Sequence, residues 1–248
     1  MDDAKAAVFK YPDTNSTRAN IEYLNRKYTN QKVAIIGMGG TGAYILDLVS
    51  KTPVQEIHIY DGDFFQLHNA FRAPGAIAGE KFDVPGGLKK VQYYTDTYSN
   101  MHAGITPHDY YVTPDNISEL SAYDFVFISV DKNAVRSTIA DGLLKLGMSF
   151  IDSGLGVNKV DDALIGSLRI TTGTKTKSDH LSYRIGSMEF EENDYCANIQ
   201  IADLNCLNAT LAVIKWKKII GFYQDQKQEH NSLYFINTGK IINEDHTA

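Results

Sequence analysis

The sequence predicts a doubly wound α/β fold, with a mostly parallel sheet followed by a C-terminal antiparallel strand region. Two observations predict it. Short apolar runs of strand length alternate with stretches of helical apolar spacing over residues 30–156, and a glycine-rich turn joins the first run to a helix. Over residues 157–248 this alternation stops, and the pattern favours antiparallel strands. We therefore expect an N-terminal helical arm (1–29) and one domain (30–248) built from these two halves.

Composition narrows the class of protein. Hydrophobic residues make up 43% of the 248 residues and charged residues 22%, which is ordinary for a globular domain. The net charge of −6 argues against a general nucleic-acid binder. The most apolar run, Phe125–Val130, is too short to span a membrane, and residues 1–15 do not resemble a signal peptide. We expect a cytoplasmic protein with no membrane or nucleic-acid partner.

The glycine turn follows Val33–Ile36, a continuous apolar run typical of a strand buried on both faces. Gly37, Gly39 and Gly42 fit the pattern G-x-G-x-x-G, and Gly40 is an additional glycine. Glycine is needed there because the turn requires positive φ and because a Cβ would hold a ligand's phosphates away from the backbone. The residues that follow have helical spacing, so the phosphates would lie at a helix N-terminus. These residues predict a nucleotide site.

The other elements are predicted from apolar spacing and turn residues. Thr17–Lys27 is expected to be a helix with Ser16 or Thr17 as N-cap. Segments 62–87 and 173–198 lack periodicity and are expected to be loops, the first of them functional because of its length. Gly154–Gly156 is expected to be flexible. Strands are predicted at 56–61, 105–112, 124–130, 149–153 and 163–172, helices at 88–98, 133–146 and 201–220, a helical turn at 118–122 and a hairpin over 232–242; the helix 201–220 places Leu204, Leu207, Leu211 and Ile214 on one face.

Asp61 ends the second strand, 19 residues after Gly42, which is the usual place for a carboxylate that binds ribose hydroxyls. Taken alone, the glycine turn and Asp61 fit an NAD- or FAD-dependent oxidoreductase. A dehydrogenase holds its pyrophosphate mostly with backbone groups, however, and this sequence places several charged side chains nearby.

These side chains follow the predicted strands at their carboxyl ends, where they would surround the phosphates of a bound nucleotide. Arginine and lysine grip phosphate oxygens, and a carboxylate can hold Mg²⁺. Such a set suits a triphosphate that is being cleaved. Its members are Asp63, Asn69 and Arg72 in the long loop, Lys90 at the start of the next helix, and Asp131 after the strand 124–130.

These motifs together resemble the ThiF/MoeB-type adenylyltransferases, the superfamily that includes the ubiquitin-activating enzymes. The resemblance covers roughly residues 30–170, and it implies a Rossmann-like sheet. The matching segments occur in order: Gly37–Gly42, Asp61–Asn69 with Arg72, Gly87–Val91, Val130–Asp131 with Arg136, and Asp152–Gly156.

The resemblance implies ATP- and Mg²⁺-dependent adenylation of the C-terminal carboxylate of a ubiquitin-like β-grasp protein, so residues 30–248 would form an adenylation domain. By position, Asp61 would bind the ribose, and Asn69 and Arg72 would hold the phosphates. Lys90 would neutralise charge that develops on the phosphates, and Asp131 would position Mg²⁺.

The resemblance also implies a homodimer in which an N-terminal arginine reaches the partner's site. Arg18 is the first candidate and Arg26 the second. Cys196 lies in a polar loop before the long helix and is a candidate for thioester formation, which could be followed by transfer to a conjugating enzyme. Cys206 is expected to be a packed residue. Family members often bind zinc through two Cys-x-x-Cys pairs, which this chain lacks, so we expect no zinc.

Several alternatives remain open. The chain could be a nucleotide-binding but catalytically silent partner subunit, or it could adenylate a small peptide or a tRNA-base carboxylate. Asp131 could serve only as a helix N-cap, and Arg136 is interpreted as a surface residue that forms ion pairs rather than as a catalytic one.

Overall fold

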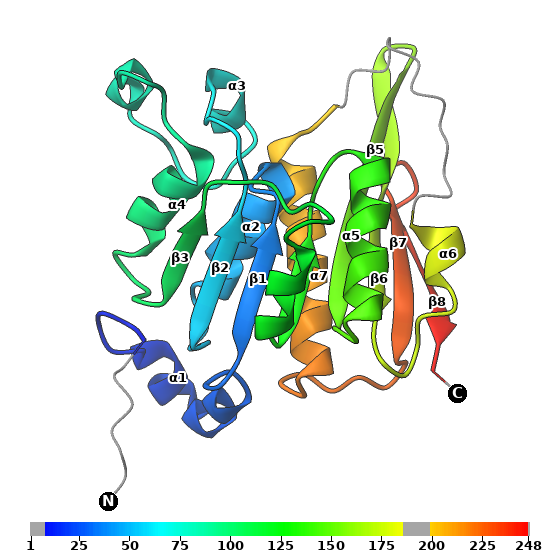
Figure 1. The fold of residues 1–248 in the computed structure, drawn as a ribbon. Coiled ribbons are helices and arrows are strands. Elements are labelled where there is room, and N and C mark those ends of the chain that lie inside the picture. The colour runs from blue at the N-terminus through cyan, green and yellow to red at the C-terminus, as the bar shows by residue number, and fades with distance from the viewer. Residues whose placement is uncertain (1–7, 186–198, 248) are drawn as a thin grey trace, which may run out of the picture.

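The computed structural model describes residues 8–185 and 199–247, which form one eight-stranded mixed sheet with helices on both faces (Figure 1). The strand order is β3-β2-β1-β4-β5-β6-β7-β8. The strands are β1 (Lys32–Ile36), β2 (Glu56–Tyr60), β3 (Ile105–His108), β4 (Phe125–Ile128), β5 (Phe150–Val160), β6 (Ala163–Gly173), β7 (Glu229–Phe235) and β8 (Lys240–His246). The α-helices are α1 (Thr14–Ala19), α2 (Gly40–Val49), α3 (Leu67–Ala70), α4 (Lys90–Tyr98), α5 (Asn133–Lys145), α6 (Leu181–Arg184) and α7 (Ala202–Ile219), and 3-10 helices span Glu22–Lys27, Gly79–Asp83 and Ile117–Ala122.

The first five strands, β3-β2-β1-β4-β5, pair in parallel, and β6, β7 and β8 continue the sheet in antiparallel pairs. The predicted fold class is therefore confirmed. The residues of β1 from Val33 to Ile36 are buried because helices cover both faces there. The carboxyl ends of the parallel strands lie together at the top of Figure 1, where the loops carrying the predicted site also lie.

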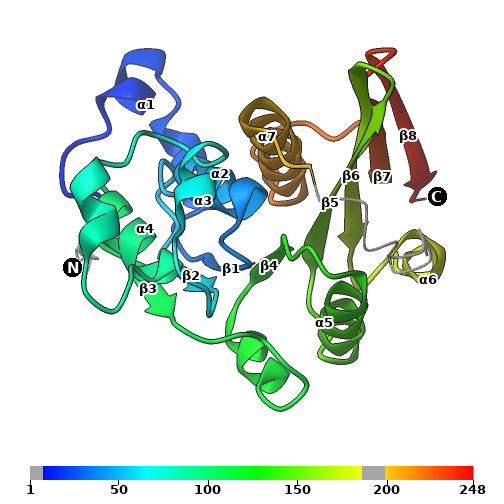
Figure 2. The same cartoon turned by 90° about the horizontal axis from the view of Figure 1, so that it is seen from above.

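The two faces of the sheet carry different helices (Figure 2). One face packs against α2, α4 and α7, in a core that includes Ile35, Leu46 and the fully buried Trp216. The other face packs against α5, α6 and the 3-10 helix Ile117–Ala122, in a core that includes Ile128 and Leu143. The carboxyl ends of β1 and β4 are thus held between two packed layers.

The strand predicted to end at residue 153 continues to Val160. Gly154 pairs with Arg169 and Gly156 with Ser167, so the segment expected to be flexible is instead part of a strand. The β6 strand supplies the hydrogen bonds that local sequence cannot indicate. The β5–β6 hairpin turns at Asp161, whose φ is 53°.

The long helix α7 forms as predicted, but the apolar face expected from its leucines is not its buried face. Leu204, Leu207 and Leu211 are only partly buried, and Ile214 is 38% exposed. The buried face contains mainly small or polar residues that allow close packing against α2 and β5: Asn205, Asn208, Ala209, Ala212 and Val213, with Lys215 and Trp216.

The helix predicted over Thr17–Lys27 is divided in two. Asp13, not Ser16 or Thr17, is the N-cap of α1, and its carboxylate accepts a hydrogen bond from the Ser16 N–H at 3.0 Å. Asn20 ends α1 in the left-handed conformation with φ 55°. A 3-10 helix then follows. The described residues contain no helix long and apolar enough to cross a membrane.

Four buried or partly buried histidines should make the stability of the folded protein depend on pH. Burial lowers the pKa of His102, His108, His180 and His230 in the folded protein. Below about pH 6.5 the unfolded chain therefore binds more protons, and stability falls as the pH decreases. At pH 5.5 each histidine that stays neutral costs at most about 1.4 kcal/mol. We expect the melting temperature to fall between pH 7.5 and pH 5.5.

Two variants test this cause. His102→Gln should flatten the pH dependence, because the His102 ring is buried between the Val54 carbonyl and the Gly104 N–H. His68→Gln is the matched control, since His68 is exposed and should leave the slope unchanged. A melting temperature that stays constant or rises over this pH range would contradict the prediction.

Candidate active site

The glycine turn connects β1 to α2 at the carboxyl edge of the sheet. Gly37 has φ +89°, a conformation that favours glycine, and its N–H donates to the Tyr60 carbonyl at 2.8 Å. Gly39 is the N-cap of α2. A Cβ on Gly42 would lie 1.9 Å from the Gly37 carbonyl oxygen, so helix and strand approach as closely as the backbone allows. The turn leaves backbone N–H groups at a helix N-terminus.

Asn205, which sequence analysis did not identify, packs against this turn from α7. Its Oδ1 accepts a hydrogen bond from the Thr41 hydroxyl at 3.1 Å, and its Nδ2 donates to the Arg72 carbonyl at 3.4 Å. Gly40 leaves room for it, because a Cβ there would lie 2.0 Å from the Asn205 amide nitrogen. Asn205 and Asn208 are buried three residues apart in one helix, and this spacing was the available signal.

Asp61, Asp63 and Lys90 form one charged cluster beside the turn. Asp61 is 6% exposed, and its carboxylate accepts the Met38 N–H at 2.7 Å and the Asp63 N–H at 2.8 Å. The Lys90 ammonium lies 3.3 Å from Asp61 and 2.7 Å from Asp63. Partial burial acts to raise the pKa of Asp63, but hydrogen bonds from Lys90 and Tyr111 bring it below its usual range. Asp61 and Asp63, from the motif after β2, thus contact Lys90, from the motif at the start of α4.

Asn69 and Arg72 lie on the long loop that contains α3. Asn69 is buried, and its Oδ1 accepts the Gln66 N–H at 2.8 Å, so its Nδ2 is the group suited to a phosphate oxygen. The Arg72 Nε is buried without a hydrogen-bond partner among the residues described. A buried guanidinium N–H that lacks an acceptor suits an anionic ligand. The loop brings both donors to the same edge of the sheet as the glycine turn.

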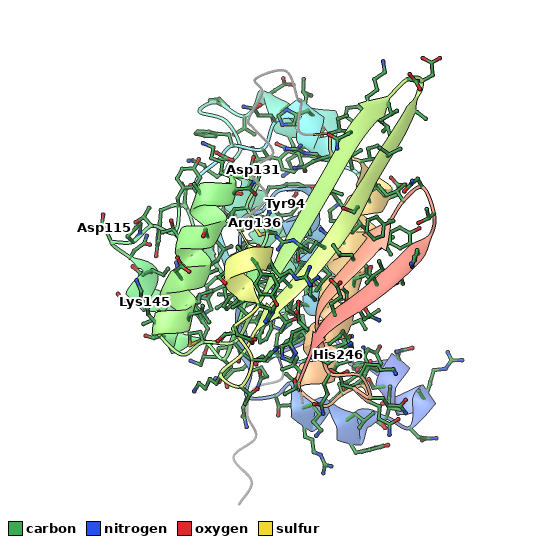
Figure 3. The ribbon with its side chains drawn as sticks, turned by 90° about the vertical axis from the view of Figure 1, so that its right-hand side faces the viewer. Tyr94, Asp115, Asp131, Arg136, Lys145 and His246 are labelled. Carbon is green, nitrogen blue, oxygen red and sulfur yellow. The ribbon has the colours of Figure 1, made fainter. Side chains whose placement is uncertain are left out.

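Asp131 is exposed and follows β4, two residues before α5. It is not the N-cap of α5, because that position is Lys132. Figure 3 shows Asp131 and Arg136 at the same end of α5, opposite Lys145. The Arg136 Nη2 donates to the Val130 carbonyl at 2.5 Å and so holds the residue directly before Asp131.

Arg136 itself corrects the interpretation made from sequence. It is 6% exposed rather than on the surface, and its Nη1 lies 3.0 Å from the fully buried carboxylate of Asp152. The Arg169 guanidinium lies 2.6 Å from the same carboxylate oxygen. Burial lowers the pKa of Arg169, although the charge of Asp152 opposes this. Two guanidinium groups thus share one buried carboxylate next to the loop of Asp131.

A family model matches most of the chain. The ThiF family matches residues 16–228, which is most of the chain. The protein belongs to the ThiF family.

Individual relatives are more distant. "Ubiquitin-like modifier-activating enzyme 5" of Drosophila grimshawi is 28% identical over 160 residues, which cover 58% of this chain but only 38% of the relative. Among solved structures, E. coli MccB crystallised with ATP superposes with a TM-score of 0.71 at 17% identity, covering 96% of this chain and 73% of that one. PaaA gives a TM-score of 0.69 at 17% identity, covering 100% and 78%. These structures share the ThiF-type fold.

Three further residues that sequence analysis singled out in this ThiF-family chain are Arg18, Cys196 and Cys206. Arg18 is exposed on α1, which packs near the amino ends of the strands, away from the glycine turn of its own chain (Figure 1). Cys196 lies outside the described residues. Cys206 is a partly buried free cysteine on α7.

The residues present allow a simple test of whether Mg²⁺ fits. No group of three or more His, Cys, Asp or Glu side chains in the described part of the chain could hold a metal. Mg²⁺ is usually held by one or two carboxylates together with substrate phosphates and water. Asp131, a single exposed carboxylate that follows the carboxyl end of β4, fits this ion provided that a bound nucleotide supplies the phosphates.

Proposed function

We propose that this protein is an ATP-dependent adenylyltransferase that activates the C-terminal carboxylate of a ubiquitin-like β-grasp protein. The observation that carries the proposal is the buried Asp61–Lys90 ion pair beside the glycine turn of a ThiF-family chain, together with the buried Arg72 Nε, which has no hydrogen-bond partner among the residues described. A nicotinamide or flavin enzyme would not need a buried arginine N–H and a lysine at this place.

In this reaction a carboxylate oxygen of the protein substrate attacks the α-phosphorus of ATP. The bond from that phosphorus to the oxygen bridging to the β-phosphate breaks, pyrophosphate leaves with the electron pair, and an acyl-adenylate remains. The contribution of the enzyme is to position the reactants and stabilise the developing charge. No proton has to be removed, because the nucleophile is already ionised at neutral pH.

Each residue of the candidate site has one task in this proposal. Asp61 retains acceptor capacity for the ribose hydroxyls, and the α2 N-terminus lies under the phosphates. Asn69 and Arg72 donate to phosphate oxygens. Lys90 moves from Asp63 toward the leaving pyrophosphate as charge develops there. Asp131 would hold Mg²⁺ together with the phosphates of bound ATP, and the ion would supply positive charge that neutralises part of theirs.

The substrate class rests on the relatives. The fly relative is named as an activating enzyme for a ubiquitin-like modifier. We propose that the protein acts as a homodimer in which Arg18 reaches the partner's site, since Arg18 is too far from the site of its own chain. Thioester formation at Cys196, followed by transfer to a conjugating enzyme, belongs to the same proposal as a later step.

ATP–pyrophosphate exchange tests the reaction. We expect radioactive pyrophosphate to enter ATP when a cognate β-grasp protein with a free C-terminal carboxylate is added. The same protein amidated at its C-terminus is the matched control and should give no exchange, because it lacks the nucleophile. Arg72→Ala should lower the exchange rate by at least about 100-fold, the scale of losing one stabilising donor in a reaction of this kind.

Three other outcomes decide against the proposal. Exchange supported only by a short peptide would change the substrate class. ATP binding without exchange for any carboxylate would indicate a catalytically silent subunit. Bound nicotinamide or flavin, visible in the absorbance spectrum of the purified protein, would favour an oxidoreductase.

A further inference from the structure

Tyr111 presents an exposed aromatic ring beside the predicted ribose carboxylate. It lies three residues after β3 and is 57% exposed. Its ring lies against the backbone of Gly62, the residue directly after Asp61: a Cβ on Gly62 would lie 2.9 Å from one ring carbon and 3.0 Å from the next. The ring thus contacts a surface that only glycine leaves open.

Hydrogen bonds hold Tyr111 both at its side-chain hydroxyl and at its backbone carbonyl. Its hydroxyl donates to the Asp63 carboxylate, which is paired with Lys90 at 2.7 Å. Its carbonyl accepts a hydrogen bond from the Asn116 Nδ2 at 2.9 Å, and the Asn116 Oδ1 accepts the Thr113 N–H at 2.7 Å. The hydrogen bond to Asp63 raises the pKa of Tyr111 to about 12, so the hydroxyl remains a donor at neutral pH.

The position of the ring follows the geometry of a nucleotide. The base and the phosphates leave a ribose from opposite ends of the sugar. With the phosphates at the glycine turn after β1 and the ribose on Asp61 after β2, the base must lie on the far side of Asp61. In a sheet ordered β3-β2-β1, that side is the end of β3 and the residues that follow it. Tyr111 lies there.

We propose that the ring of Tyr111 is the platform on which the adenine base of ATP stacks. This assignment rests on the proposed function, because it requires ATP at the glycine turn. Stacking of a base on an aromatic side chain typically contributes enough to change affinity several-fold or more, and it depends little on which base is present. Tyr111 would therefore strengthen nucleotide binding, and its hydroxyl would keep the ring in place through Asp63.

The neighbouring Tyr110 provides a matched control. Tyr110 contacts a different group of side chains from Tyr111. Its hydroxyl donates to Glu119 at 2.8 Å, and its ring meets those of Tyr60 and His108. Tyr110 is 39% exposed, and Tyr110→Leu removes an aromatic ring whose contacts lie with Tyr60 and His108 rather than with the segment Asp61–Asp63.

The test compares ATP with inorganic tripolyphosphate, which has the phosphates but no base, by calorimetry on the full chain. Tyr111→Leu should weaken ATP binding about tenfold and leave tripolyphosphate binding unchanged. Tyr111→Phe keeps the ring and should lose less ATP affinity than Tyr111→Leu. Tyr110→Leu should bind both ligands as the unmodified protein does. Equal melting temperatures would exclude a general effect on folding.

Two results would overturn the assignment. If Tyr111→Leu binds ATP as the unmodified protein does, the ring does not contact the base. If Tyr111→Leu weakens the binding of ATP and of tripolyphosphate equally, Tyr111 acts on the phosphates through Asp63 and Lys90. Failure of the unmodified protein to bind ATP would instead overturn the proposed function, and this assignment with it.

Discussion

Replacing Gly42 with alanine should destabilise the domain severely. The new Cβ would lie 1.9 Å from the Gly37 carbonyl oxygen and 2.5 Å from the Ser129 hydroxyl oxygen. These two atoms are already joined by a hydrogen bond of 2.7 Å, so neither can withdraw without separating α2 from the ends of β1 and β4. We expect a loss of about 3 kcal/mol or more in the free energy of unfolding. The gain from placing alanine in a helix, about 1 kcal/mol, is too small to offset it.

Gly39→Ala is the control that separates packing from ligand binding. Gly39 has φ −75° and ψ −158°, which alanine can adopt, and a Cβ there would meet no atom within 4 Å. Its stability in urea should stay within about 1 kcal/mol of the unmodified protein. The methyl group would occupy open space at the helix N-terminus, so ATP affinity measured by calorimetry should fall about tenfold. Equal destabilisation by both alanines would show that the close contact at Gly42 is not what requires glycine.

The parts of the fold that sequence analysis predicted correctly are those determined over short stretches of chain. The apolar run of β1, the glycines after it and the helical spacing of α2 are contiguous, and each restricts the backbone directly. The β-α alternation of residues 30–156 predicted a parallel half, in which the carboxyl ends of the strands share one edge. These features place Asp61, Lys90 and Asp131 at one edge of the sheet before any contact is known.

Features that depend on distant residues were not predicted. The extension of β5 through Gly154 and Gly156 exists because β6 pairs with it, and glycine by itself indicates a loop. The buried face of α7 was missed because Asn205 and the alanines pack closely on α2, while the more apolar leucines are only partly buried. Periodicity reports which face of a helix is apolar, and close packing here required small side chains instead.

In the candidate site, too, local features were predicted and contacts between distant residues were not. Spacing indicated Asp61, and the family resemblance indicated Lys90, but their ion pair and its extension through Asp63 to Tyr111 join three separate segments of the chain. Arg136 was interpreted as a surface residue because its acceptors, Asp152 and the carbonyls of Val130 and Ser153, are not visible in a helical pattern. Tyr111 and Asn205 carry no motif, and only tertiary contact reveals them.

The other large effect is expected at Asp152, whose carboxylate is completely buried between Arg136 and Arg169. Asp152→Asn keeps the size of the side chain but leaves two guanidinium groups facing each other without a counter-charge. Leaving a buried charge uncompensated typically costs about 3–5 kcal/mol, and we expect a loss of that size in urea unfolding. Asp179→Asn is a suitable control, because Asp179 forms its ion pair with Lys177 at 3.0 Å while its side chain is 72% exposed. Its stability should barely change.

A second substitution distinguishes surplus charge from lost hydrogen bonds. Adding Arg169→Met to Asp152→Asn removes one of the two opposed guanidinium groups and should recover part of the lost stability, giving a favourable coupling in a double-mutant cycle. Arg136 would keep its backbone acceptors, the Ser153 carbonyl at 3.2 Å and the Val130 carbonyl at 2.5 Å. If the double variant is instead less stable than Asp152→Asn alone, repulsion between the arginines is not the cause. Arg136 still holds Val130, the residue before Asp131, so the double variant should also retain pyrophosphate exchange. If the stability loss of Asp152→Asn came from displacement of the loop that carries Asp131, exchange would be lost as well.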